Sequence, residues 1–208
     1  MLHELEILVD FVEQKYEQLL NEWKISDLYV QINQRKILVK NISEDRSLLS
    51  AVLNYRTFIN DKNLELKMGL DSLNLESEIN TRVKAQNSIE QKINNYMTER
   101  HEYGEIPMKK CFNDLYGIRI IFEEEVNHKE IEEFINSRFC EYDLKCIDSS
   151  KPEGYVATHI YFQKDNKSFS WELQIWDKSH EESNISLHRQ YKQAYTKWEL
   201  ENKGGESF

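Results

Sequence analysis

The sequence predicts a mixed α/β fold in which a helical first third is followed by strands that alternate with helices. Residues 2 to 23 place apolar side chains at helical spacing with acids between them. Residues 114 to 122 and 169 to 176 are rich in isoleucine and aromatic side chains, which is typical of strands. Because the 208 residues include only six glycines and two prolines, we expect a helical extension over residues 1 to 79 and a second region over residues 80 to 208 to form one compact unit.

The first third contains a second predicted helix. Ser43 and the two acids that follow it indicate an N-cap and a negative first turn. Apolar side chains at helical spacing then continue to about residue 59. Residues 29 to 40 mix alternating and continuous apolar patterns, so we assign them to no element.

Strands mixed with helices are predicted from about residue 80 onward. Arg82 and Lys84 lie on one side of an extended segment, and Ser88 with Gln91 has capping-box spacing, which predicts a helix to about residue 100. Two cations before a helix N-terminus suit the binding of phosphate. The later predicted elements are a helix over residues 129 to 139, strands over residues 142 to 148, 155 to 162 and 169 to 176, and a helix from residue 179. We expect a mixed, mostly antiparallel sheet of about five strands.

The composition excludes several classes of protein. A net charge of −10 argues against wrapping of nucleic acid, so we expect no DNA partner. Cys111, Cys140 and Cys146 are widely spaced and odd in number, which predicts reduced thiols. No apolar run approaches the roughly 18 residues of a membrane span, and acids stand where a signal peptide needs basic and apolar residues. We therefore expect a cytoplasmic protein without membrane contacts.

Two acids on predicted strands are the strongest candidates for chemistry. Asp114 stands where the chain enters the strand of residues 114 to 122, and Arg119 projects from that strand. In the strand of residues 169 to 176, period-2 alternation places Glu172 and Gln174 on one face and the apolar side chains on the other. Two carboxylates with cations upstream indicate phosphoryl chemistry on a divalent metal.

A turn with Pro152 and Gly154 precedes Tyr155, and alternation puts Tyr155 and His159 on one face of the next strand. Six ordered motifs now stand out: Arg82-x-Lys84, Ser88-Ile89-x-x-Lys92, Asp114-x-x-Gly117-x-Arg119, Gly154-Tyr155-x-x-x-His159, Glu172-x-Gln174-Ile175 and His188-x-x-Tyr191-Lys192. Together they resemble the RelA/SpoT-type alarmone synthetase domain over residues 80 to 193. Each motif alone is weak, whereas the six in order are specific.

The resemblance implies a nucleotidyltransferase-like sheet and the transfer of pyrophosphate from ATP to the 3′-hydroxyl of GDP or GTP. It implies that Asp114 and Glu172 bind Mg²⁺, with Glu172 also a candidate base for the acceptor hydroxyl. The residues implied to bind ATP are Arg82, Lys84, Ser88, Lys92 and Arg119. Those implied to bind the acceptor are Tyr155, which would stack on its base, His159, Gln174, His188 and Lys192.

The chain departs from the family pattern on the acceptor side. Trp176 stands where the family has an arginine, and Ala157 and Thr158 stand where a serine is usual. Residues 1 to 79 lack the His-Asp motif of the family's hydrolase half, so product hydrolysis is not expected. The chain ends 16 residues after Lys192, which favours a monomer over the tetramer of small synthetases.

Three functions stay open at this point. The first is a guanosine alarmone synthetase, and the second is a toxin that modifies the 3′ end of tRNA, or adenosine nucleotides, and is neutralised by an antitoxin. For the second, Arg35-Lys36, Lys109-Lys110 and the basic residues from 189 to 192 are the candidate tRNA groove. The third is a non-catalytic nucleotide sensor or interaction module that has kept the pocket. Each site residue also has a structural alternative, such as a cap for Asp114 and a solvated charge for Arg82.

Overall fold

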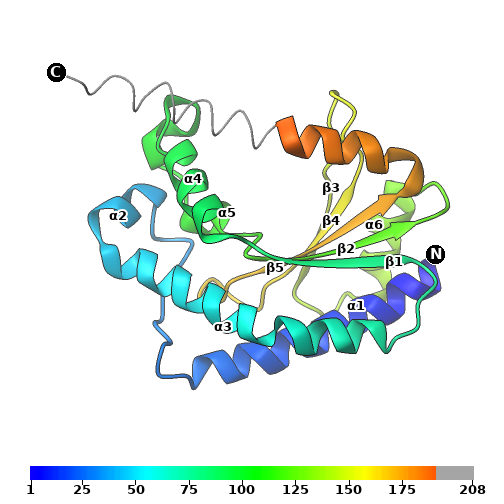
Figure 1. Ribbon diagram of the computed structural model, residues 1–208, viewed down its shortest axis with the longest axis horizontal. Coiled ribbons are helices and arrows are strands. Elements are labelled where there is room, and N and C mark those ends of the chain that lie inside the picture. Colours follow the sequence, from blue (N-terminus) through cyan, green and yellow to red (C-terminus); the bar gives the residue numbers. More distant parts are fainter. Residues whose placement is uncertain (191–208) are drawn as a thin grey trace.

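The computed structural model describes residues 1–190 and shows a five-stranded sheet with helices on both sides (Figure 1). The helices are α1 (Leu2–Lys24), α2 (Val39–Glu44), α3 (Arg46–Asp71), α4 (Gln86–Tyr96), α5 (Met108–Cys111) and α6 (His128–Arg138), with short 3₁₀ helices η1 (Glu99–Gly104) and η2 (Lys178–His180). The strands are β1 (Glu78–Val83), β2 (Tyr116–Phe122), β3 (Leu144–Asp148), β4 (Thr158–Phe162) and β5 (Trp171–Asp177). Residues 181 to 190 are also helical.

The sheet is mixed, and its spatial order is β1-β2-β5-β4-β3. Strands β2 and β5 pair in parallel, whereas β1 with β2, β5 with β4, and β4 with β3 pair antiparallel. Of the strands within residues 1 to 190, β5 comes last in sequence, and it lies at the centre of the sheet. This arrangement confirms the predicted mixed α/β class with a mostly antiparallel sheet and N-terminal helices.

One face of the sheet is apolar and packs on the N-terminal helices. Alternate side chains of β2 and β5, among them Ile118 and Leu173, share a core with the buried stripes of α1 and α3. Trp171 is 1% exposed, and its indole N–H donates to the hydroxyl of Tyr55 on α3 at 2.9 Å. In Figure 1, α1 and α3 lie below the sheet and the helix of residues 181 to 190 lies above it. The first 71 residues thus cover the sheet face that is opposite to the polar one.

The starts of two helices were predicted wrongly. Asp45, not Ser43, caps α3, because the backbone at Asp45 is extended and its carboxylate accepts from the N–H of Ser47. Ser43 lies inside α2, where its hydroxyl donates to the carbonyl of Lys40. Likewise α4 begins at Gln86, so Ser88 is its third residue and not its cap.

The strand β4 begins three residues later than predicted. Tyr155 and Ala157 lie in an extended loop, in which the carbonyl of Tyr155 accepts from the N–H of Lys151. Gly154 permits the reversal in this loop because its φ is +99°, a value that other residues rarely adopt. Among residues 1 to 190, no helix is both long and apolar enough to span a bilayer.

Candidate active site

Strand register gathers polar side chains on the sheet face that lies away from the N-terminal helices. One row of cross-strand neighbours is Arg82, Gly117, Glu172 and Tyr161. The next row is Asn80, Arg119, Gln174 and His159. Neighbouring side chains on one face of a sheet are about 5 Å apart at Cβ, so long polar side chains reach one another. The predicted alternation of Glu172 and Gln174 against the apolar residues of β5 is confirmed.

Asp114 lies just before β2 and is bonded by two ammonium groups. The Nζ of Lys84, which follows β1, lies 2.6 Å from Oδ2, and the Nζ of Lys92, in the second turn of α4, lies 3.0 Å from Oδ1. Lys92 also donates to Oδ1 of Asn113 at 3.2 Å. Burial would raise the pKa of Asp114, but the charges of Lys92 and Lys84 outweigh it and hold this pKa below its usual value. Asp114 is therefore a carboxylate at neutral pH.

The two lysines differ in their surroundings. The side chain of Lys84 is 8% exposed, and its pKa is lowered mainly by burial, which Asp114 offsets in part. For Lys92, burial also lowers the pKa, but Asp114 more than offsets it, so the pKa lies above the ordinary value. Two cations on one carboxylate leave this group with a net positive charge.

Glu172 on β5 is bonded by neutral donors. The hydroxyl of Tyr161 donates to Oε1 at 2.9 Å, and the amide nitrogen of Gln174 donates to Oε2 at 2.8 Å. Nδ1 of His159 lies 3.2 Å from Oε1. Burial would raise the pKa of Glu172, but the hydrogen bond from His159 together with that from Tyr161 keeps this pKa below its usual value. Glu172 is thus ionised although it is only 7% exposed.

Arg119 on β2 is fixed between Gln174 and Trp176. Its Nε and Nη2 donate to Oε1 of Gln174 at 3.1 and 2.9 Å, and its guanidinium carbon lies 3.4 Å from the centre of the Trp176 ring. A cation over an indole face is stabilised by the ring quadrupole. Trp176 is therefore a direct partner of Arg119.

Arg82 and Ser88, both predicted to bind ATP, lie at the edge of this group. Arg82 is exposed on β1 and shows no ion pair within residues 1 to 190. Together with burial, its charge contributes to the lowered pKa of Lys84 and of Arg119. Ser88 is half-buried in the first turn of α4, one turn before Lys92.

Aromatic side chains surround the residues that were predicted to bind the acceptor. The hydroxyl of Tyr155 lies 3.0 Å from Nε2 of His159, and its ring makes edge contacts with Trp176 and with His188 from the helix of residues 181 to 190. Tyr155 is 5% exposed, so no ring face is open for a base in this arrangement. Burial lowers the pKa of His188 to about 4, which leaves it neutral at pH 7. Lys192 lies outside the described residues.

Three side chains of this region were not found from the sequence. Tyr161 follows His159 by two residues, so the same alternation would have placed it on this face. Asn113 directly precedes Asp114, where no pattern marks it. Arg56 on α3 donates from Nε to the carbonyl of Lys84 at 3.0 Å, a contact between distant segments that no local pattern reveals.

The carboxylates fit a Mg²⁺ ion that also binds substrate. Mg²⁺ prefers carboxylate oxygens, phosphate oxygens and water. Asp114 and Glu172 are both ionised, and Asp114 is near enough for its charge to act on Glu172. Among residues 1 to 190 no group of three or more acidic, histidine or cysteine side chains forms a metal cage. Such an ion would therefore need phosphate oxygens to complete its coordination.

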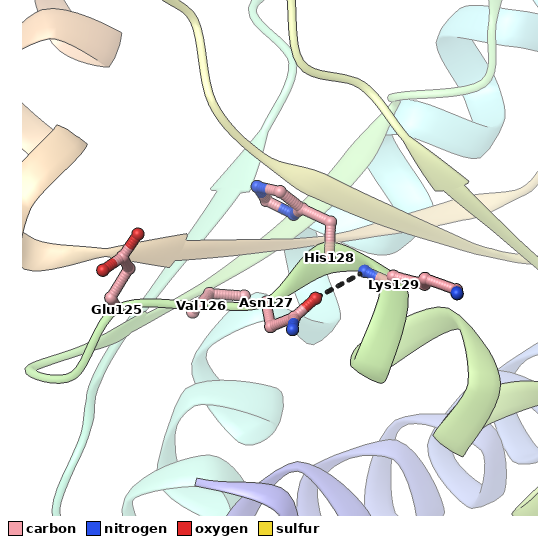
Figure 2. Close-up of a pocket in the computed structure, with 5 residues that line it drawn as sticks. All are labelled: Glu125, Val126, Asn127, His128 and Lys129. Atoms are coloured by element: carbon pink, nitrogen blue, oxygen red, sulfur yellow. Dashed lines mark hydrogen bonds between the residues drawn. The ribbon is translucent and has the colours of Figure 1, made fainter.

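A pocket elsewhere on the molecule does not belong to this site. Figure 2 shows its lining, the segment from Glu125 to Lys129 at the start of α6, where Asn127 caps the helix through the N–H of Lys129. His128 in this segment contacts Thr158, whose side chain points away from that of the adjacent His159. The pocket therefore lies on the other side of the sheet.

Residues 81–196 match the family described as "Region found in RelA / SpoT proteins". This match spans more than half of the chain, so the chain belongs to this family. No curated protein sequence matches it.

Three solved structures are similar over most of the chain. Small alarmone synthetase 1 from Bacillus subtilis is 21% identical, with 73% of this chain and 82% of that chain covered and a TM-score of 0.43. The same synthetase bound to AMPCPP is 18% identical over 76% and 88%, with a TM-score of 0.39. Small alarmone synthetase 2 from Bacillus subtilis is 20% identical over 70% and 80%, with a TM-score of 0.40.

Proposed function

We propose that this protein transfers pyrophosphate from ATP to the 3′-hydroxyl of a guanosine nucleotide, GDP or GTP, with Mg²⁺ as its metal. The observation that carries this proposal is the pairing of two ionised carboxylates, Asp114 and Glu172, with a set of cations on one face of the sheet. Phosphoryl transfer depends on positioning and on neutralising the charge of the transferred group. Family membership supports the same reaction.

On the donor side, Arg82, Lys84, Lys92 and Arg119 bind the triphosphate in this proposal, and Ser88 lies beside them. Their charges neutralise oxygens of the β- and γ-phosphates while AMP leaves. Asp114 keeps Lys84 and Lys92 in place. Mg²⁺, held by Asp114 and Glu172, would supply further positive charge at the phosphates.

On the acceptor side, Glu172 accepts the proton of the 3′-hydroxyl. The hydroxyl oxygen then bonds to the β-phosphorus, and the bond from that phosphorus to the oxygen of the α-phosphate breaks. Gln174 and His159 border the acceptor, and Tyr155 and His188 form an aromatic wall for its base. Lys192 is proposed for the same role. Because Tyr155 is covered by His188, the base would displace that contact to stack on Tyr155.

A second acceptor, the 3′ end of tRNA, is favoured by a cluster of cations next to the site. Lys145 on β3 is the register partner of Tyr161 and extends the row of Glu172. Besides burial, the nearby charges of Lys145 and Arg35 lower the pKa of Lys109, so three cations from separate segments lie close together. Such a cluster suits a nucleic-acid backbone. In this alternative a protein antitoxin would be the partner, and in both we expect a monomer.

The test offers the purified protein Mg²⁺ and ATP labelled at the γ-phosphate, with GDP, GTP, ADP or deacylated tRNA in parallel. Asp114→Asn is the inactive variant, and Asp61→Asn, at an exposed position, is the matched control. Loss of one such group typically lowers the rate about 10²- to 10³-fold. Label on GDP or GTP supports the proposal. Label on tRNA or ADP would show that this molecule, and not a guanosine nucleotide, is the acceptor. ATP binding without transfer to any acceptor would show a sensor and overturn the catalytic proposal.

A further inference from the structure

Tyr161 stands directly opposite Glu172 across the β4–β5 pair. Its hydroxyl lies 2.9 Å from Oε1 of Glu172 and 3.2 Å from Nδ1 of His159. Register fixes these contacts, because Tyr161 pairs with Glu172 and His159 pairs with Gln174. None of the six motifs quoted above includes Tyr161, so the sequence pattern assigned it no role.

The hydrogen bonds around Glu172 have a single direction. A carboxylate only accepts, so the proton of the Tyr161 hydroxyl points to Oε1 of Glu172. Nδ1–H of His159 lies 3.2 Å from this hydroxyl oxygen and also 3.2 Å from Oε1 of Glu172, so the imidazole is a second donor beside the same carboxylate oxygen. In the neutral imidazole this leaves Nε2 of His159 to accept from the hydroxyl of Tyr155 at 3.0 Å. Each donor in the series from Tyr155 through His159 and Tyr161 therefore points toward Glu172.

The second oxygen of Glu172 is fixed by a residue of its own strand, β5. Gln174 donates to Oε2 at 2.8 Å, and Arg119 on β2 orients Gln174 by donating twice to its amide oxygen. Glu172 is thus held at one oxygen by β4 and at the other by a β2–β5 contact. Removal of either anchor frees the torsions of a flexible side chain.

We infer that Tyr161 is a positioning residue for Glu172: its hydroxyl fixes Oε1 where the proton of the acceptor hydroxyl is taken up. This inference rests on the proposed role of Glu172. Tyr161 itself transfers no proton and touches no reacting atom. A displacement of about 1 Å at such a group costs roughly 100-fold in rate. Loss of the Tyr161 hydroxyl leaves Oε1 with the longer contact to His159, so kcat should fall about 10- to 100-fold.

The first test is Tyr161→Phe, which keeps the ring and removes only the hydroxyl. We expect kcat to fall by this factor while the KM for ATP and the Tm stay at the wild-type values, because no phosphate contact and no packing is lost. Tyr142→Phe is the matched control, since its hydroxyl donates to Asp10 at the surface and its loss should leave kcat unchanged. An unchanged kcat in Tyr161→Phe overturns the inference, as does a fall in kcat that only follows a lowered Tm.

The second test is a double-mutant cycle with Glu172→Asp. An aspartate is one methylene shorter and does not reach the Tyr161 hydroxyl, so adding Tyr161→Phe to Glu172→Asp should change kcat less than twofold. An effect of Tyr161→Phe that is equally large in both backgrounds would show that Tyr161 does not act through Glu172. If Glu172→Gln keeps the wild-type rate, the proposed role of Glu172 fails first. If Glu172→Gln lowers kcat but Tyr161→Phe does not, this inference fails and the proposed role of Glu172 stands.

Discussion

Asp114 and Glu172 lie on the same side of the sheet and are held by opposite kinds of partner. Asp114 accepts from the ammonium groups of Lys84 and Lys92, so its charge is more than compensated. Glu172 accepts from a phenol and an amide, with an imidazole nitrogen at 3.2 Å, and keeps most of its negative charge. In the proposed function this difference divides the work: Asp114 organises cations for phosphates, and Glu172 offers negative charge to a metal ion or a proton.

The largest expected difference between the two carboxylates is in how much each contributes to stability. Asp114→Asn leaves two lysines with little exposure and no counter-charge, so we expect the free energy of unfolding to fall by about 3 kcal/mol. Glu172→Gln keeps an acceptor for Tyr161 and should cost less than about 1 kcal/mol. Urea unfolding of both variants measures the difference. Equal losses would mean that the partners of the two carboxylates do not set their energetics.

Glu13 extends the comparison to a carboxylate whose burial outweighs the charge of the nearby Lys164. It is 6% exposed on α1, and within residues 1 to 190 its Oε2 has no hydrogen-bond partner. Burial, with the charge of Glu17, raises its pKa to about 7. A raised pKa means that stability is greatest below the unfolded value of 4.5 and is lost as the pH rises through about 7.

Glu13→Gln should therefore stabilise the protein by about 2 kcal/mol at pH 8 and by little at pH 5. Unfolding of both proteins at the two pH values measures this, with Glu133→Gln at an exposed position as the control. A gain of the same size at both pH values would show that ionisation of Glu13 is not the cause.

Arg119 offers a smaller test, because it supports Glu172 through Gln174. Arg119→Lys keeps the charge but loses the planar group that bonds Gln174 at two nitrogens and stacks on Trp176. We expect a loss of about 1 kcal/mol in stability and a raised KM for ATP. Urea unfolding and initial rates at varied ATP measure both. Unchanged values would show that a point charge suffices at this position.

Substitution of Gly117 is expected to change activity while leaving stability almost unchanged. It lies between Arg82 and Glu172 in the same row, and a Cβ there would meet only backbone oxygens, at 4.0 Å. Gly117→Ala should therefore change the free energy of unfolding by less than about 1 kcal/mol. The added methyl enters the space between a cation and a carboxylate, so we expect the ATP KM to rise. Thermal unfolding and initial rates at varied ATP measure both quantities. A large loss of stability, or an unchanged KM for ATP, would contradict the prediction.

The sequence predicted what depends on neighbouring residues. Alternation placed Glu172 with Gln174 correctly, because a strand repeats every two residues whatever its partners are. The same rule reached His159 but was not carried on to Tyr161. Alternation did not predict the ion pairs of Lys84 and Lys92 with Asp114, since these depend on β1 lying next to β2. Nor did it give the contact between Arg119 and Trp176, which requires β5 to lie beside β2. The functional roles of these residues stay predictions.

The position of β5 has a consequence for folding. The central strand, β5, follows the other four strands of the described chain, and both of its neighbours, β2 and β4, precede it. Contacts between distant segments and parallel pairing form slowly. Arg119, Gln174, Tyr161 and Glu172 therefore cannot come together on a growing chain until β5 has been synthesised.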